Sequence, residues 1–142
     1  MRIYEILERV EPSNGHTCEE VTDIQIRDLE KFADRLLGKL HIDVAFTRHF
    51  KERMSDARND PCIVVTELQR LFKKIKQDKG RHIKELGHDT QAVIKDVSRN
   101  LNIPAVFDFK DDGEIEVRMK TIMRKPDFKS PDPVVAYENR RR

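Results

Sequence analysis

His49 and Arg53 are the residues whose types and spacing point most directly to chemistry. They stand four positions apart, just after Thr47, a natural helix-capping residue. Side chains with this spacing share one face of a helix. A guanidinium binds phosphate, and an imidazole exchanges protons near neutral pH, so the pair indicates work on a phosphate group. The structural alternative is that His49 caps the helix or fills the margin of the core, while Arg53 pairs with Glu52 or Asp56.

Two further basic sets could complete such a site. If a concave sheet brings both of them near His49, they would form a phosphate-binding groove. The alternative for each set is a solvated surface. The first lies on the outer side of an expected helix and comprises Lys73, Lys74, Lys76 and Lys79, followed by Arg81. The second is expected along one face of the last strand and comprises Arg118, Lys120, Arg124 and Lys125.

The elements that must position these residues follow from hydrophobic spacing. Thr22 or Asp23 is expected to cap a helix that runs to Leu40, and a short helix around His49 is expected to extend to Arg58. A third helix, from Thr66 to Lys79, is expected to end at Gly80. The apolar stripe of the first is Ile24, Leu29, Phe32, Leu36, Leu37 and Leu40, and that of the third is Leu68, Leu71, Phe72 and Ile75.

Strands are indicated by alternation of apolar and polar residues. One covers Ile42–Phe46, and three more cover 91–96, 105–109 and 114–124, the last two joined by a tight turn at 111–113. The sequence therefore predicts an α+β fold. Its antiparallel sheet, one strand plus a three-strand meander, packs against about three helices on one face.

Residues 23–125 form the expected domain. Residues 1–22 form an N-terminal arm with an apolar helical stripe at Ile3, Ile6, Leu7 and Val10. Residues 126–142 form an extended, basic tail whose prolines disfavour helix, although 134–137 could add an edge strand. The arm and the tail are the segments expected to contact a protein partner.

Composition narrows the function classes. In 142 residues, 28 basic and 26 acidic side chains nearly cancel, so only local clusters could bind nucleic acid. No apolar run is long enough for a membrane span, and no histidine or cysteine spacing indicates a metal site or a cofactor. Cys18 and Cys62 are expected to be reduced in a cytoplasmic protein, with a disulfide between them as the lesser alternative.

A family resemblance rests on two short stretches. Thr47-x-His49-Phe50-x-x-Arg53, with Arg58 beyond, resembles a helix of the RelE/BrnT-type toxin ribonucleases. The closer likeness is to the RegB family of phage endoribonucleases, whose leucine-phenylalanine-histidine-lysine-isoleucine-lysine pattern is similar to residues 71–76. Its first histidine carries over to His49, whereas Lys73 stands in place of the second.

The resemblance implies a RelE-like fold and an origin in a phage. It also implies that the protein lies in the host cytoplasm or in the virion. It implies metal-independent cleavage of RNA, in which the ribose 2′-hydroxyl attacks the adjacent phosphate. The other outcome that it allows is RNA binding without cleavage. His49 is then the expected base, Arg53 and Arg118 hold the phosphate, and Lys73 and Arg124 assist. Arg58, Lys76 and Lys120 are expected to contact RNA. The alternative is a non-catalytic structural or virion-associated protein that reuses this fold.

Overall fold

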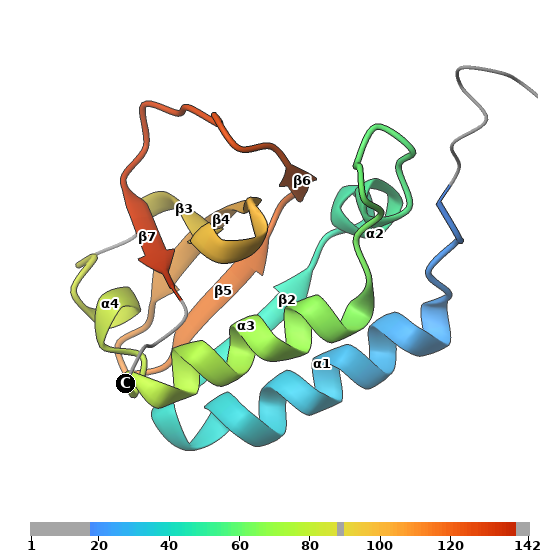
Figure 1. The fold of residues 1–142 in the computed structure, drawn as a ribbon. Helices are drawn as coiled ribbons and strands as arrows, with labels where there is room; N and C mark the ends of the chain where they lie inside the picture. The colour runs from blue at the N-terminus through green and yellow to red at the C-terminus, as the bar shows by residue number, and fades with distance from the viewer. Residues whose placement is uncertain (1–17, 88–89, 139–142) are drawn as a thin grey trace, which may run out of the picture.

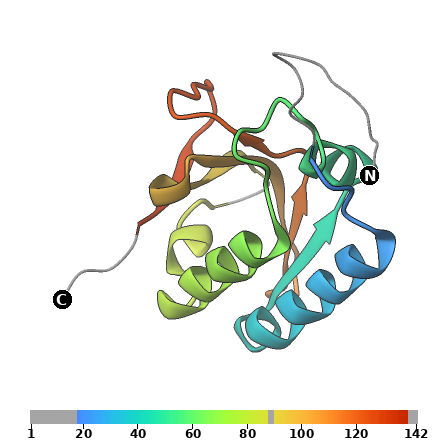
Figure 2. The ribbon, with the colours of Figure 1, turned by 45° about the vertical axis from the view of Figure 1, so that its right-hand side comes forward.

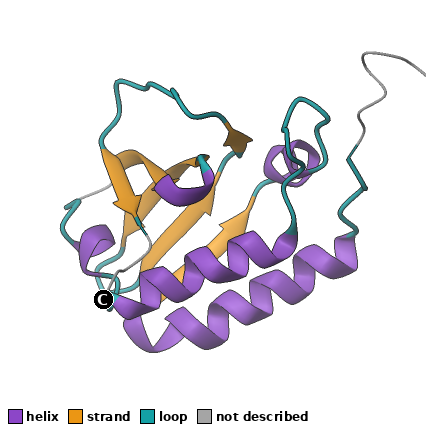
Figure 3. Cartoon of the chain, in the orientation of Figure 1, coloured by secondary structure: helices purple, strands orange, loops and turns teal. Residues whose placement is uncertain are grey.

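The computed structural model of the chain describes residues 18–87 and 90–138. The apolar arm stripe at residues 3–10 and the terminal arginines lie outside these ranges. Figure 1 shows helices packed on one face of a single sheet, and Figure 3 separates the two layers by colour. The helices are α1 (Asp23–Leu37), α2 (Arg48–Met54), α3 (Val65–Gln77) and α4 (Arg81–Lys84), with 3₁₀ turns η1 (Gly38–Leu40) and η2 (Val97–Arg99). The strands are β2 (Ile42–Phe46), β3 (Thr90–Asp96), β4 (Leu101–Phe109), β5 (Ile115–Met119), β6 (Met123–Arg124) and β7 (Val134–Tyr137).

The sheet has six strands and is mixed. Its order is β2-β5-β4-β3-β7, and the short strand β6 pairs with β4. The antiparallel meander of β3, β4 and β5 is confirmed. The expectation of a wholly antiparallel sheet is wrong, because β2 pairs with β5, and β7 with β3, in parallel. Both parallel pairs join strands far apart in the chain, which leaves room for the long connection that parallel pairing needs.

Helix α1 begins at a complete capping box. Thr22 Oγ1 accepts from the Gln25 backbone N–H at 3.1 Å, and Gln25 Oε1 accepts from the Thr22 N–H at 2.8 Å. Its buried stripe is Ile26, Leu29, Ala33 and Leu37. Ile24, expected in that stripe, is 66% exposed because it lies on the opposite side of the first turn.

Helix α3 buries the expected side chains, Leu68, Leu71, Phe72 and Ile75. It packs beside α1 over the sheet (Figure 1). Gly80 follows its end with φ +69°, where a Cβ would come within 2.6 Å of the Ile42 side chain. The positive φ therefore favours glycine at this turn, and a Cβ would also require the end of the Ile42 side chain to shift.

Helix α2 follows β2 directly and is fixed at both ends. Thr47 Oγ1 accepts from the Phe50 N–H at 3.1 Å and donates to the Lys120 carbonyl at 2.8 Å, which ties the helix to the end of β5. The side chains of Phe50 and Met54 are fully buried. The helix ends before the expected Arg58, because Asp56 Oδ1 accepts from the Arg58 N–H at 2.9 Å and stabilises a turn instead.

Cys18 and Cys62 form a disulfide, with their Cα atoms 5.5 Å apart. The expectation of two reduced thiols is therefore wrong for this structure, and the alternative pairing is present. The chain before α1 runs beside the loop that precedes α3, as Figure 2 shows, and this brings the two cysteines together although 44 positions separate them.

The tail contributes the strand β7 at the edge of the sheet. Val135 and Tyr137 are buried there, whereas Val134 is 55% exposed. Burial, and secondarily the Asp78 carboxylate, raise the pKa of the Tyr137 phenol. None of the helices within the described ranges combines the length and the apolar character that crossing a bilayer requires.

Candidate phosphate-binding site

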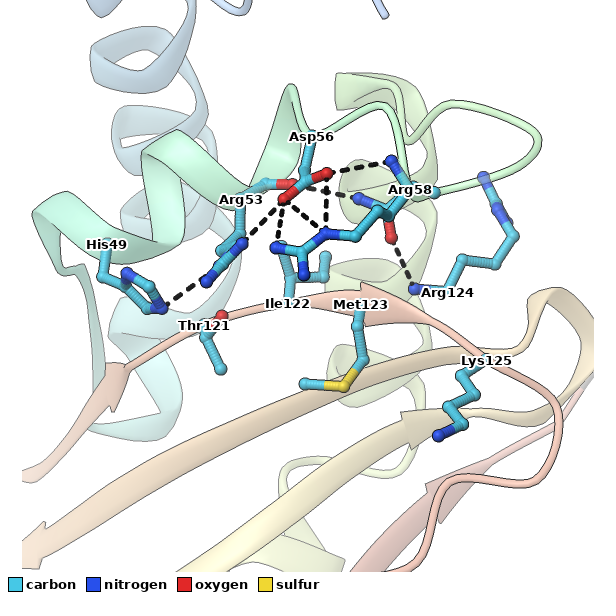
Figure 4. Close-up of a pocket in the computed structure, with 10 residues that line it drawn as sticks. His49, Arg53, Asp56, Arg58, Thr121, Ile122, Met123, Arg124 and Lys125 are labelled. Carbon is cyan, nitrogen blue, oxygen red and sulfur yellow. Dashed lines mark hydrogen bonds and ion pairs between the residues drawn. The ribbon is translucent and has the colours of Figure 1, made fainter. Parts of the chain in front are cut away.

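A pocket of about 460 Å³ opens between α2 and the segment that joins β5 to β6 (Figure 4). Helix α2 supplies His49 and Arg53, and the loop after it supplies Asp56, Arg58 and Asn59. Residues 121–125 form the opposite wall. The pocket therefore lies where the sequence places its strongest candidate pair.

His49 and Arg53 are in contact. Arg53 Nε donates to His49 Nε2 at 3.2 Å. This hydrogen bond forms only when His49 Nε2 carries no proton. His49 is exposed, and Thr47 caps the helix. Neither structural alternative for His49, as a cap or a core residue, is therefore observed.

Asp56 holds two guanidinium groups at the pocket. Its Oδ2 accepts from Arg53 Nη1 at 2.7 Å and from Arg58 Nη2 at 2.8 Å. The expected structural pairing of Arg53 with Asp56 is thus present. Each guanidinium has five N–H donors, so both retain donors for a ligand. One carboxylate set against two arginines leaves this wall positively charged.

Arg124 is a structural residue. Its side chain is 8% exposed and donates to Glu67 Oε1 at 2.8 Å. It also donates to three backbone carbonyls, those of Pro61, Cys62 and Arg99, at 2.7, 3.0 and 2.8 Å. These contacts fasten the loop before α3 to β6. Its expected role as a phosphate ligand would require breaking them.

Asn59 is a positioning residue that begins the turn-forming stretch Asn59-Asp60-Pro61 and is not among the site residues expected from the sequence. Its side chain donates to the Arg53 carbonyl at 3.0 Å and accepts from the Arg124 N–H at 2.9 Å. It is 5% exposed. Asn59 therefore holds the end of α2 against β6 and fixes the width of the pocket. The Asn-Asp-Pro turn was the only sequence signal for it.

Four expected site residues lie outside the pocket. Arg118 pairs with Glu116 at 3.2 Å, and Lys120 donates to Gln91 at 3.2 Å. Lys73 and Lys76 are exposed in the C-terminal half of α3, whereas α2 lies beyond its other end (Figure 1). The structure thus brings together His49, Arg53, Arg58 and Arg124, and leaves Lys73, Lys76, Arg118 and Lys120 apart from them.

The expected basic face of one long last strand does not form. Strand β5 ends at Met119, and Ile122 turns inward with 1% exposure. Lys120 N donates to the Pro104 carbonyl at 2.9 Å, but proline has no N–H to return the bond. The pairing with β4 is interrupted at this point. The exposed Lys125, at the pocket rim, forms no side-chain ion pair with another described residue.

No group of three metal-ligating side chains gathers anywhere in residues 18–87 or 90–138. The pocket itself offers the imidazole of His49 and the guanidinium groups of Arg53 and Arg58. No protein-family model matches the chain, and comparisons with curated proteins and with solved structures likewise return no significant match.

Proposed function

We propose that the chain binds RNA at this pocket and cleaves it without a metal ion. The observation that carries the proposal is a trio at one pocket: Asp56 holds the guanidinium groups of Arg53 and Arg58, and Arg53 in turn contacts His49. Two held guanidinium groups are suited to a phosphodiester, and an exposed imidazole beside them can take a proton. The roles expected for Lys73 and Arg118 are not part of the proposal.

The reaction begins when the phosphodiester replaces His49 as the partner of Arg53. This frees His49 Nε2, which accepts the proton of the ribose 2′-hydroxyl. The 2′-oxygen attacks phosphorus, the bond from phosphorus to the 5′-oxygen breaks, and solvent supplies a proton to the leaving oxygen. Arg53 and Arg58 bind the charge that develops on the phosphoryl oxygens. The products carry a 2′,3′-cyclic phosphate and a 5′-hydroxyl.

A relation to the RelE and RegB ribonucleases, and with it an origin in a phage, is part of the same proposal. Its support is the motif around His49 and the α+β architecture, in which β2 leads directly into α2.

The test is cleavage of a structured RNA in EDTA, with the ends of the products identified. His49→Ala should abolish cleavage, while the free energy of unfolding changes by no more than about 0.5 kcal/mol because the side chain is exposed. Arg48→Ala, on the same helix but outside this pocket, is the matched control and should cleave normally. A substrate with 2′-deoxyribose at the cleaved position should resist. Cleavage unchanged in His49→Ala would overturn the mechanism.

The second candidate is an interaction protein of phage particles that lacks catalysis. The observation that favours it is the placement of Lys73, Lys76, Arg118 and Lys120 away from His49. Strands β2 and β7 each have one unpaired edge within the described sheet, where a further strand could add. This candidate predicts a stable assembly and no cleaved RNA, whereas the first predicts turnover by the monomer.

A further inference from the structure

A second cationic surface lies on α3 and α4, apart from the pocket. Six basic side chains are exposed along these two helices and the turn between them. We call this surface the α3–α4 basic face, and its members are Arg70, Lys73, Lys76, Lys79, Arg81 and Lys84.

These six cations are uncompensated within the part of the chain that the structure describes. None of them forms an ion pair with a described residue. Eleven other lysine, arginine or histidine residues do form ion pairs, and Lys74 of α3, which pairs with the buried Asp96, is one of them. The carboxylates nearest in the sequence are Asp78, whose side chain is 8% exposed and bonded to His82, and the exposed Glu85, which follows Lys84 directly. The face therefore presents a dense positive charge in a chain whose total charge is only +2.

The pocket lies beyond the N-terminal end of α3, whereas the face runs from Arg70, in the middle of α3, past its C-terminal end to α4. Figures 1 and 2 both show α2 beyond the N-terminal end of α3 and α4 beyond its C-terminal end. A helix rises 1.5 Å per residue, so the 13 residues of α3 span about 20 Å. One extended polyanion could contact both surfaces, but a single phosphate could not.

The composition of the face indicates what it fits. The large apolar side chains that are exposed in the described ranges are Ile24, Val64, Val97 and Val134, and none of them belongs to this face. A helix that inserts into a lipid surface needs such side chains. The one phenylalanine of α3 and α4, Phe72, is fully buried, and the ring of His82 packs on Tyr137. Neither side chain therefore offers a platform on which bases could stack. What remains is contact with a regular phosphate backbone.

We propose that the α3–α4 basic face binds the phosphate backbone of a double-stranded region of RNA. Recognition of an RNA duplex rests largely on backbone contacts and shape, which suits a rigid helix carrying cations and no stacking groups. This inference rests on the proposed function, because it assigns the pocket to a single-stranded stretch and the face to the adjoining duplex.

The experiment measures binding of a fluorescent RNA duplex without single-stranded ends, over a series of salt concentrations. Arg70→Gln/Lys73→Gln/Lys76→Gln removes three charges from the face. It should weaken binding at least about tenfold at low salt, and flatten the slope of log K against log salt by about 2 to 3. Arg27→Gln/Lys31→Gln/Arg35→Gln removes three charges from exposed positions of α1 and is the matched control, with duplex affinity close to that of the wild type.

Three results would overturn the inference: equal losses in the two variants, no duplex binding by the wild type, or tighter binding to anionic vesicles or polyglutamate than to the duplex. Cleavage of a single-stranded dinucleotide, whose single phosphodiester cannot occupy the pocket and the face together, is scored separately. It should be equal in the wild type and in both variants. If this oligonucleotide is never cleaved while the duplex result stands, the proposed function fails and the binding surface remains.

Discussion

At the scale of single residues, two arginines at the same pocket have different roles. The Arg53 side chain is 36% exposed and shares a carboxylate with Arg58, so it can turn toward a ligand. The Arg124 side chain is 8% exposed and bonded to Glu67 and three carbonyls. The sequence alone predicts a phosphate-binding role for both. The two arginines differ in how deeply their side chains are buried. The burial of Arg124 depends on contacts between segments about 60 positions apart in the chain.

Replacing Arg124 should destabilise the protein severely. Arg124→Met leaves Glu67, 8% exposed, without its closest cation, and leaves three carbonyls without their donors. Breaking a buried ion pair from one side costs about 3–5 kcal/mol, and we expect a loss of that size in urea unfolding. Arg58→Met is the control, because that side chain is 75% exposed, and it should cost less than about 1 kcal/mol.

The double variant Arg124→Met/Glu67→Met tests the cause of that loss. If the uncompensated carboxylate dominates, the double variant should recover part of the stability that the single variant loses. A double variant less stable than Arg124→Met alone would assign the loss to the backbone carbonyls instead.

At the scale of elements, the sequence predicts those features that depend on residues close together in the chain. The cap at Thr22 and the apolar stripe of α3 follow from spacing within a few residues, and both are observed. The parallel pairing of β2 with β5 could not be read from alternation, because the pattern of a strand does not name its neighbour or its direction. The end of β5 depends on Pro104 of the adjacent strand, so the sequence of β5 alone could not show it.

The candidate site likewise has some contacts that the sequence predicts and others that depend on the tertiary structure. The contact between His49 and Arg53 was predictable because both stand on one helix at a spacing of four. The separation of Lys73 from them was not, since it depends on how α3 lies relative to α2. Asn59 joins two segments through its side chain, and no pattern in its own neighbourhood marks that role.

The disulfide between Cys18 and Cys62 should stabilise the native state through loop closure. It joins residues 44 positions apart, for which restriction of the unfolded chain contributes about 2–4 kcal/mol. Cys18→Ser/Cys62→Ser should therefore lower the urea midpoint. Wild-type protein kept in reductant should match the double variant, and the oxidised wild type should exceed both.

A thiol assay provides the control for that prediction. The oxidised native chain should show no reactive thiol before reduction and two after it. Two thiols in protein purified without reductant would contradict the pairing, and equal midpoints with and without reductant would contradict its contribution to stability.

At the scale of the whole molecule, the C-terminal segment is part of the sheet rather than an appendage. Strand β7 covers the edge of β3 from Val93 to Asp96, and its Val135 and Tyr137 are 3% and 5% exposed. Burial of one such side chain contributes about 1.5–3 kcal/mol, and the total stability of a domain is about 5–15 kcal/mol. A chain without β7 should therefore lose a large part of its stability.

The last prediction compares a chain that ends at Asp132 with one that ends at Glu138. The shorter chain should melt at a much lower temperature or without cooperativity, because β3 becomes an unprotected edge and the apolar surface under β7 is exposed. The longer chain retains β7 and should melt cooperatively. Val135→Ala and Val134→Ala repeat the comparison within the full chain, and only the buried Val135 should matter. If the chain ending at Asp132 instead sediments as a stably folded monomer while the full chain assembles, the segment serves a partner, and the interaction-protein alternative gains the support that the ribonuclease proposal loses.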